Sequence, residues 1–247
     1  MTDPRLSVIT QRLDNISEII AVSGGKGGVG KSLIASTLAL ILTKEGYSVG
    51  LFDLDFTSPS THLILNTSGM FPKEEAGILP PVINDMKYMS IIHYSGEHTL
   101  PLRGEAISNA LIELFAITRW GSLDYLILDM PPGITDVTLD LIRFIKTVRF
   151  LIVTTPSTLA FETVKKLTSF LHLVQIPILG IIENMQLDQS VSLKQRIVDL
   201  ALPYSGTISY DPAVEGALGN INKLLDTSFA EQLKKIVSTV FPRKLLT

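Results

Sequence analysis

The sequence predicts an α/β fold in which a doubly wound, mostly parallel sheet carries helices on both faces. Two observations predict this architecture. Short apolar segments of strand length alternate along the chain with longer segments of helical spacing, as in successive βαβ units. Several of the short segments are apolar at nearly every position, which is typical of strands buried on both faces. The chain has 247 residues and no internal repeat or linker, so we expect a single domain over residues 1–247.

The expected elements follow from these patterns and from residues that stop helices. Gly46 stands just past the first long helical segment, as a helix-terminating glycine does. The predicted strands cover residues 18–22, 47–53, 87–93, 125–129, 149–154, 178–183 and 204–208. The predicted helices cover residues 33–44, 105–118, 137–147, 158–174 and 193–200.

One connection, residues 56–86, interrupts the alternation. It carries Pro59, Pro72, Pro80 and Pro81 and is too long for a plain crossover loop. A small hairpin around Gly77 or a functional excursion would explain its length. A mobile surface loop and a switch or partner-binding role for its distal half both remain open.

A glycine-rich segment follows the first predicted strand and leads into the first predicted helix. Gly25, Gly30, Lys31 and Ser32 fit the pattern G-x-x-x-x-G-K-[ST] of a phosphate-binding loop. Glycines allow consecutive backbone N–H groups to face one anion, and the helix N-terminus adds partial positive charge. A glycine-rich turn that merely joins strand and helix is the alternative, but the complete motif favours ATP or ADP. The predicted nucleotide contacts within this loop are Gly25, Lys26, Gly27, Gly28, Val29, Gly30, Lys31 and Ser32.

Carboxylates end two further predicted strands. Asp129 closes a run of apolar residues and is followed by Met-Pro-Pro-Gly, as in a Walker B segment that orients Mg²⁺. Gly133 at the end of that sequence is free to turn its peptide toward a γ-phosphate, as a switch requires. Turn chemistry or helix capping is the alternative for such acids.

Asp53 and Asp55 end the second predicted strand and would lie on the same side if the strand continues that far. One plausible arrangement places Asp53 toward the hydration shell of Mg²⁺ and Asp55 toward the attacking water. Together with the Ser32 hydroxyl, the predicted metal residues are therefore Ser32, Asp53 and Asp129.

Composition narrows the function further. A net charge of −3 gives no sign of a nucleic-acid surface, and no apolar run reaches the length of a membrane span. The N-terminus has no signal-peptide pattern, so we expect a cytoplasmic protein. The sequence contains no cysteine, which excludes disulfides and cysteine-held iron–sulfur clusters within this chain. The histidines have no ligand-like spacing and receive no metal or catalytic role.

The C-terminal segment carries an apolar stripe behind a capping-box pattern that starts at Ser228. Such a stripe could lie on a membrane, but it more often packs against the sheet of its own domain, and we favour packing. The stripe consists of Phe229, Leu233, Ile236, Val237, Val240 and Phe241.

The segment from Lys26 to Ser32 resembles the deviant Walker A motif of the MinD/ParA/nitrogenase-iron-protein superclass of ATPases. Further matches, specific in order and spacing, extend over nearly the whole chain and resemble the Mrp family of iron–sulfur cluster carriers and scaffolds. They are Asp53-x-Asp55 with Pro59-Ser60, Leu102-Arg103-Gly104, Trp120 to Leu126, Asp129 to Gly133, Thr154 to Pro156, Pro177 to Met185, and Asp211-Pro212.

The resemblance implies roles for individual residues. Lys26 is similar to the lysine that contacts nucleotide across a dimer interface, so two subunits would enclose two ATP molecules. Asn184 matches the position that reads the adenine edge, and Asp211-Pro212 matches the loop beside the base. Asp55 matches the carboxylate that positions water, which with Lys26 and Lys31 completes the expected catalytic set.

The sequence departs from the family at one place. Cluster-carrying members have a Cys-x-x-Cys pair soon after the Glu-Asn-Met segment, where this chain reads Gln-Leu-Asp-Gln-Ser-Val-Ser-Leu from Gln186 onward. Iron–sulfur clusters need thiolate ligands, so this chain serves a different client or relies on a partner that supplies them.

These observations leave three functions in order of preference. The first is a slowly hydrolysing, partner-stimulated, homodimeric ATPase switch of the Mrp type that acts on an unknown client protein. The second is a positioning ATPase like MinD or ParA, acting on a membrane or a protein partner. The third is a small-molecule kinase, which the phosphate loop alone would permit.

Overall fold

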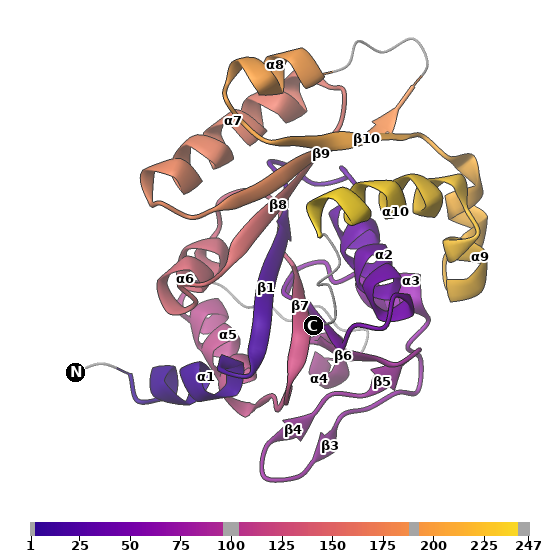
Figure 1. The fold of residues 1–247 in the computed structure, drawn as a ribbon. Helices are drawn as coiled ribbons and strands as arrows, with labels where there is room; N and C mark the ends of the chain where they lie inside the picture. Colours follow the sequence, from indigo (N-terminus) through magenta and orange to yellow (C-terminus); the bar gives the residue numbers. More distant parts are fainter. Residues whose placement is uncertain (1–2, 96–103, 188–192, 242–247) are drawn as a thin grey trace, which may run out of the picture.

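The computed structural model describes residues 3–95, 104–187 and 193–241. An eight-stranded sheet forms its centre, in the order β10-β9-β8-β1-β7-β2-β6-β5 (Figure 1). Every neighbouring pair is parallel except β5 with β6, so the sheet is mostly parallel as predicted. Its strands are β1 (Ile16–Ser23), β2 (Val49–Asp53), β5 (Val82–Ile83), β6 (Met86–Ser90), β7 (Leu123–Asp129), β8 (Arg149–Thr154), β9 (Ile178–Gln186) and β10 (Tyr204–Ser209).

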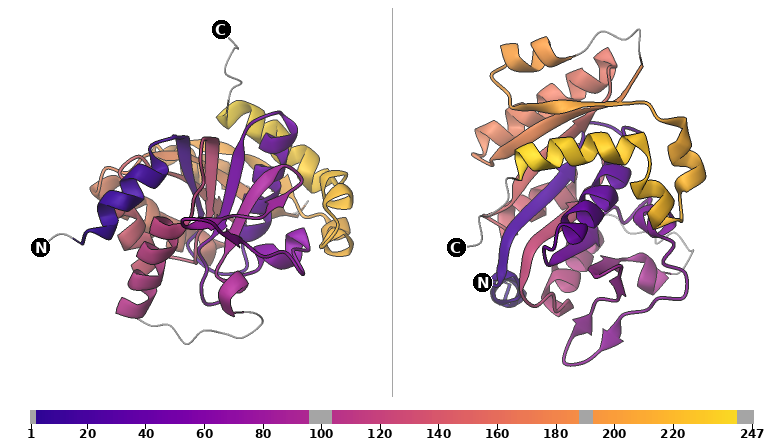
Figure 2. Two further views of the ribbon diagram at one scale, coloured as in Figure 1. Left: turned by 90° about the horizontal axis from the view of Figure 1, so that it is seen from below. Right: turned by 45° about the vertical axis from the view of Figure 1, so that its right-hand side comes forward.

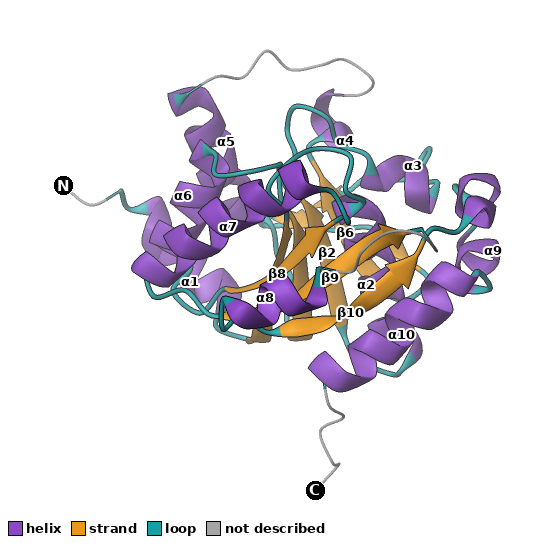
Figure 3. Cartoon of the chain, turned by 90° about the horizontal axis from the view of Figure 1, so that it is seen from above, coloured by secondary structure: helices purple, strands orange, loops and turns teal. Residues whose placement is uncertain are grey.

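Helices cover both faces of this sheet (Figure 3). On one face lie α1 (Arg5–Leu13), α5 (Glu105–Ile117), α6 (Asp136–Phe144), α7 (Thr158–Leu173) and α8 (Lys194–Asp199), whose buried side chains share a hydrophobic core with that side of the sheet. The other face carries α2 (Lys31–Lys44) and α10 (Ser228–Val240), with α3 (Thr61–Leu65) and α9 (Ile221–Leu225) at one end. The predicted fold class is therefore confirmed.

The parallel arrangement gathers the carboxyl ends of the central strands along one edge of the sheet. β1 lies between β7 and β8, and β7 lies between β1 and β2. The order of the strands reverses at β1, which is where ligands bind in open α/β sheets. The loops that follow β1, β2 and β7 therefore meet at one place.

The connection between β2 and β6 contains more structure than a loop. A two-stranded sheet, β3 (Lys73–Glu74) with β4 (Ile78–Leu79), forms the small hairpin around Gly77 that the sequence suggested. Gly77 has φ +126°, and a Cβ there would lie 2.7 Å from the carbonyl oxygen of Ile117. This close approach explains why glycine occupies the turn.

Several elements differ from the prediction: α1, α3, α9, β5 and a 3-10 helix at Pro212–Ala217 were not predicted, and one strand was predicted too long. The strand expected at 87–93 ends at Ser90, and α4 (Ile92–Ser95) follows it, because the Ser90 hydroxyl accepts the backbone N–H of Ile92 and turns the chain. The helix α1 was missed because it buries only Ile9 and Leu13, too few apolar positions for a clear helical period. Three of the other predicted helices, α5, α7 and α8, are one residue shorter than predicted at one or both ends. The helix α6 begins one residue early and ends three residues early, and α2 begins two residues early, at Lys31.

The C-terminal helix α10 lies across α2 and β10 (Figure 2). Its apolar stripe is turned into the core, and Leu233 is fully buried. The structure therefore confirms the prediction that the apolar stripe packs against the sheet of its own domain. Among the described residues, none of the helices combines the length and apolarity needed to cross a bilayer.

Replacement of Leu233 by alanine tests this docking. We expect Leu233→Ala to lower the free energy of unfolding by about 3 kcal/mol, because a buried cavity replaces the leucine side chain. The exposed neighbour Lys234 provides the control, and Lys234→Ala should stay within about 0.5 kcal/mol of the parent. Urea denaturation measures both, and equal effects of the two substitutions would contradict the docked position of α10.

Candidate nucleotide and metal site

The glycine-rich loop between β1 and α2 has the backbone geometry that a phosphate-binding loop requires. Gly28 and Gly30 have φ values of +77° and +87°, in the left-handed region that other residues rarely adopt. A Cβ on Gly30 would lie 2.4 Å from the side-chain nitrogen of Asn184. The loop thus depends on glycine for its conformation and for its contact with β9.

Two other predicted loop residues have structural roles. A Cβ on Gly25 would lie 2.6 Å from the backbone of Thr163, so this glycine lets the loop approach α7. Val29 is buried in the core shared with α2, and its backbone oxygen accepts a hydrogen bond from Asn184 at 3.0 Å.

Lys31 begins α2 and is buried, with 7% of its surface exposed. Its Nζ donates to the backbone oxygen of Lys26 at 3.5 Å. Burial lowers the pKa of Lys31, and the negative charges of Asp129 and Asp55 act in the opposite direction. The side chain therefore places a cation next to two carboxylates at the base of the loop.

Asp53 and Asp129 lie opposite each other on the paired strands β2 and β7, and both are completely buried. Neither oxygen of Asp129 has a hydrogen-bond partner among the described residues. Burial, followed by repulsion from Asp53, raises the pKa of Asp129 well above its usual value. Ser32 and Lys31 counteract this rise, although the Ser32 hydroxyl stays outside hydrogen-bonding geometry.

The carboxylate of Asp53, unlike that of Asp129, accepts hydrogen bonds from its neighbours among the described residues. One of its oxygens accepts the backbone N–H of Asp55 at 3.0 Å, and the other accepts the hydroxyl of Thr61 at 2.6 Å and its N–H at 3.3 Å. Burial raises the pKa of Asp53 to about 6, and these hydrogen bonds oppose the rise.

The orphaned oxygens of Asp129 fit a magnesium ion. Mg²⁺ prefers oxygen ligands, keeps several waters and takes few groups from the protein beside a bound phosphate. Ser32 and Asp129 are the residues that would hold it, with Asp53 close by. In the described part of the chain, His, Asp and Glu side chains form no cluster of three or more that could hold a metal by themselves. The donors here therefore suit a metal that arrives with a phosphate group.

A cavity of about 610 Å³ opens beside the loop. This volume is in the range of ordinary ligand pockets. Its walls come from the loop, the segment after β2, the end of β9 and the segment that follows β10. The predicted site residues among its lining are Gly27, Gly28, Gly30, Lys31, Ser32, Asp55, Asn184, Asp211 and Pro212.

The cavity also contains residues that sequence reasoning missed. Ser60 and Met185 belong to motifs of the family resemblance but received no role there, and motif spacing gave no signal for the others, because they come from segments far apart in the chain. The missed residues include Thr57, Ser58, Ser60, Leu63, Ile64, Met185, Ser209, Tyr210, Val214, Glu215, Leu218 and Phe229.

Asn184 and Asp211 hold the walls of this cavity in place. The Asn184 amide is buried and already donates to the phosphate loop, which leaves its oxygen as a further acceptor. Asp211 accepts the N–H of Ala213 at 2.9 Å and the N–H of Phe229 at 3.0 Å, so it joins the loop beginning at Pro212 to the start of α10. The base-reading role of Asn184 stays a prediction.

The two predicted switch residues lie on facing segments. β2 ends at Asp53, so Asp55 stands in the following loop, where one of its oxygens accepts the N–H groups of Thr57 and Ser58. Gly133 has φ +79°, and its N–H donates to the oxygen of Gly24 at 2.8 Å. An apolar pocket of about 450 Å³ separates the two segments and has the exposed side chains of Ile134 and Leu139 in its lining.

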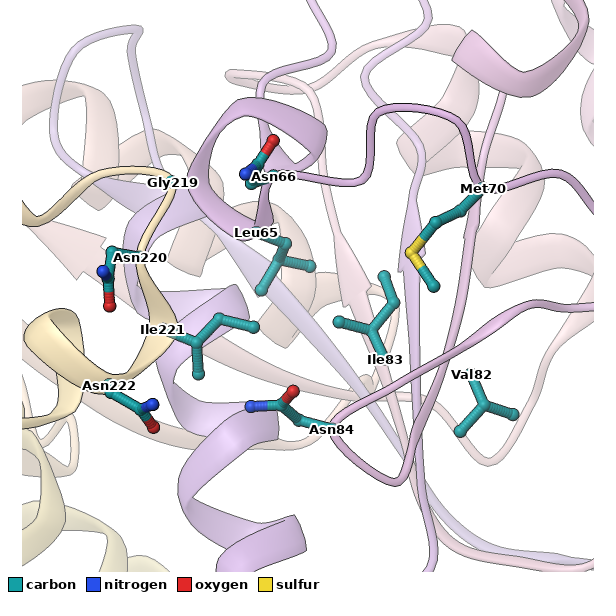
Figure 4. Close-up of a pocket in the computed structure, with 10 residues that line it drawn as sticks. All are labelled: Leu65, Asn66, Met70, Val82, Ile83, Asn84, Gly219, Asn220, Ile221 and Asn222. Carbon is teal, nitrogen blue, oxygen red and sulfur yellow. The ribbon is translucent and has the colours of Figure 1, made fainter.

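A separate groove of about 490 Å³ contains no predicted site residue (Figure 4). Leu65, Ile83 and Ile221 converge on its floor, and asparagine amides surround them (Figure 4). Two parts of the family resemblance, Leu102-Arg103 and residues 188–192 of the stretch without cysteine, lie outside the described residues.

Comparison with known proteins agrees with this geometry. The ParA family profile, described as NUBPL iron-transfer P-loop NTPase, matches residues 15–199. The iron-sulfur cluster carrier protein of Pseudomonas fragi is 39% identical over 177 residues, which are 70% of this chain and 62% of that protein. The carrier protein of Escherichia coli K12 is 39% identical over 176 residues, 70% of this chain and 48% of that one. The chain thus spans only 48–62% of the length of these two relatives.

Solved structures support the same fold. A nucleotide-binding protein in complex with ADP from Archaeoglobus fulgidus has a TM-score of 0.76 and 27% identity, over 89% of this chain and 92% of that one. MinD from Pyrococcus horikoshii, complexed with Mg-ADP, has a TM-score of 0.71 at 17% identity, over 91% and 96% of the two chains, and shows the fold alone. On the family profile and the phosphate loop together, this chain belongs to the ParA family, described as NUBPL iron-transfer P-loop NTPase.

Proposed function

We propose that this chain is a magnesium-dependent ATPase switch that works in iron–sulfur cluster assembly without holding a cluster of its own. The observation that carries the proposal is the buried Asp129, whose oxygens lack partners among the described residues, beside Lys31 and Ser32, which line a ligand-sized cavity. Keeping such a carboxylate out of water is costly unless a cation joins it. The names of the carrier relatives support the choice of pathway.

Each residue has a chemical task in this proposal. Backbone N–H groups of the loop and Lys31 bind the β- and γ-phosphates, and Mg²⁺ neutralises charge on them when bound. Asp55 accepts a hydrogen bond from the attacking water, and Gly133 contacts the γ-phosphate after giving up its bond to Gly24. Asn184 and the loop at Asp211-Pro212 border the base. The turnover is slow until a partner completes the site.

A second copy of the chain is the partner we propose for that step. Lys26 is half-buried at the rim of the loop and is absent from the lining of its own cavity. Reaching into the facing site, it would add a cation where charge develops. The client is a separate protein that supplies the thiolates this chain lacks. The burial of the α10 stripe removes the feature that favoured a membrane-bound alternative.

Nucleotide binding is the direct test of the proposal. Calorimetry with ATP and ADP should give tighter binding in Mg²⁺ than in EDTA, and phosphate release should be measurable in Mg²⁺. Lys31→Ala should abolish turnover and weaken ATP binding by at least about tenfold, as loss of a charge-assisted contact does. The exposed Lys44, at the far end of α2, provides the control as Lys44→Ala. Flat titrations of the parent with both nucleotides would refute the proposed activity.

The Asp129 carboxylate gives a test that depends on stability. Without divalent ions, Asp129→Asn should raise the free energy of unfolding by about 1 kcal/mol, because a buried charge is removed. The pKa of Asp129 is raised in the folded state. The parent protein therefore loses stability as the pH rises from about 4, the ordinary aspartate pKa of the unfolded chain, through the higher pKa of the folded state. The gain from Asp129→Asn should therefore shrink as the pH is lowered.

The same variant should lose the stabilisation that Mg²⁺ with ADP gives the parent. Thermal unfolding over a pH series, with and without Mg²⁺ and ADP, measures both effects. If Asp129→Asn destabilises the EDTA-treated protein at neutral pH, the carboxylate has a structural role and our assignment is wrong.

The dimer is tested by sedimentation. We expect the ATP-bound Asp55→Asn variant to sediment as a dimer and the ADP-bound protein as a monomer, since the γ-phosphate completes the interface. Adding Lys26→Ala should shift the ATP-bound dimer toward monomer by about tenfold in dissociation constant. The exposed Lys235 on α10 serves as the matched lysine control. A dimerisation constant that depends on neither the bound nucleotide nor Lys26 would contradict this part of the proposal.

A further inference from the structure

A buried chain of hydroxyl groups ends on Asp53. The Thr61 hydroxyl lies 2.6 Å from a carboxylate oxygen of Asp53, and the Tyr88 phenol lies 2.9 Å from the Thr61 hydroxyl. All three residues are completely buried. Asp53 ends β2, Thr61 begins α3, and Tyr88 lies on β6, so three separate elements meet in this chain.

The direction of these hydrogen bonds follows from the charge of Asp53. An ionised carboxylate can only accept, so the Thr61 hydroxyl must donate its proton to Asp53. The oxygen of Thr61 is then an acceptor for the Tyr88 phenol, which has a proton to donate because burial, followed by the charge of Asp53, raises the pKa of Tyr88. Successive hydrogen bonds aligned in one direction strengthen one another in a buried site.

The same contacts limit how Asp53 can meet a cation. A carboxylate has about four acceptor positions, and the Asp55 N–H, Thr61 N–H and Thr61 hydroxyl use three of them. Asp129, its neighbour on β7, uses none within the described residues. Asp53 is thus held in a fixed orientation with one position left for a water in the hydration shell of Mg²⁺, and Asp129 is available for direct contact.

We propose that Thr61 and Tyr88 are positioning residues for the metal site, which act by orienting the ionised Asp53 through this directed pair of hydrogen bonds. The proposal deepens the proposed function and rests on it. Thr61 and Tyr88 touch neither nucleotide nor metal. Their contribution is confined to the metal-dependent part of nucleotide binding, because the phosphate loop and the base pocket contain neither residue.

This arrangement also connects the metal site to α3. Thr61 is the first residue of α3, and Leu63 and Ile64 further along line the nucleotide cavity. Leu65, at the end of the same helix, lies on the floor of the asparagine-lined groove (Figure 4). The hydroxyl chain thus passes through the first residue of a short helix that borders both cavities.

The experiment compares ADP affinity with Mg²⁺ and with EDTA by calorimetry. Thr61→Val keeps the shape of the side chain and removes the hydroxyl, and we expect the Mg²⁺-dependent gain in affinity to fall about tenfold, as for other outer-shell partners of a metal site. Tyr88→Phe should reduce it about threefold, and Thr61→Ser should restore it to within about twofold of the parent. Affinity in EDTA should stay unchanged in all three.

Thr37→Val is the matched control. Thr37 is also a fully buried helical threonine, and its hydroxyl has no hydrogen-bond partner among the described residues. It should leave the Mg²⁺-dependent gain as in the parent. Thermal unfolding checks that each variant is folded, and Tyr88→Phe, which retains the ring, supplies the answer if Thr61→Val fails to fold.

The outcomes separate this inference from the proposed function. Absence of any Mg²⁺-dependent gain in the parent would refute the metal site itself. A parent with a clear gain that Thr61→Val and Tyr88→Phe both retain would overturn the positioning role alone. Equal losses of affinity with Mg²⁺ and with EDTA would reduce Thr61 and Tyr88 to structural residues, which also overturns it.

Discussion

The close approach of two buried carboxylates, Asp53 and Asp129, is the constraint on which the rest of the site depends. Both stand at the carboxyl ends of paired parallel strands, in register with each other. The interior offers them little solvation, and burial raises the pKa of each, with repulsion from Asp53 adding to the rise at Asp129. Lys31 places a cation near Asp129. The fold thus maintains an arrangement that is unfavourable by itself and becomes favourable when a metal and phosphates complete it.

Other parts of the molecule serve to keep this arrangement in place. Asn184 supports the phosphate loop from β9, and the N–H of Gly133 connects the segment after β7 to the same loop. Asp211 connects the loop after β10 with α10. Two segments that are distant in sequence are therefore each tied to the phosphate loop by a single hydrogen bond, and a third hydrogen bond holds the wall of the cavity.

Much of the fold could be predicted because its strands are buried on both faces and read as apolar runs. The phosphate loop, Asp53 and Asp129 were identified because their local patterns are specific and the ends of parallel strands converge. The strand that ends at Ser90 was predicted too long, since the Ser90 hydroxyl turns the chain while the sequence stays apolar. The role of Thr61 and Tyr88 could not be predicted, because the pairing of β2 with β6 brings Tyr88 near Asp53, and no local sequence pattern indicates that pairing.

The free edge of the sheet at β5 has a consequence for the protein as a solute. An exposed edge strand offers unpaired backbone groups to other chains and invites aggregation. Here the last strand has two residues, Val82 and Ile83, and Pro80 and Pro81 directly precede it. Because proline has no N–H to donate, a foreign strand could align with only a very short stretch of this border. The short edge strand therefore limits self-association at the edge of the sheet that lies farthest from β1, the strand before the phosphate loop.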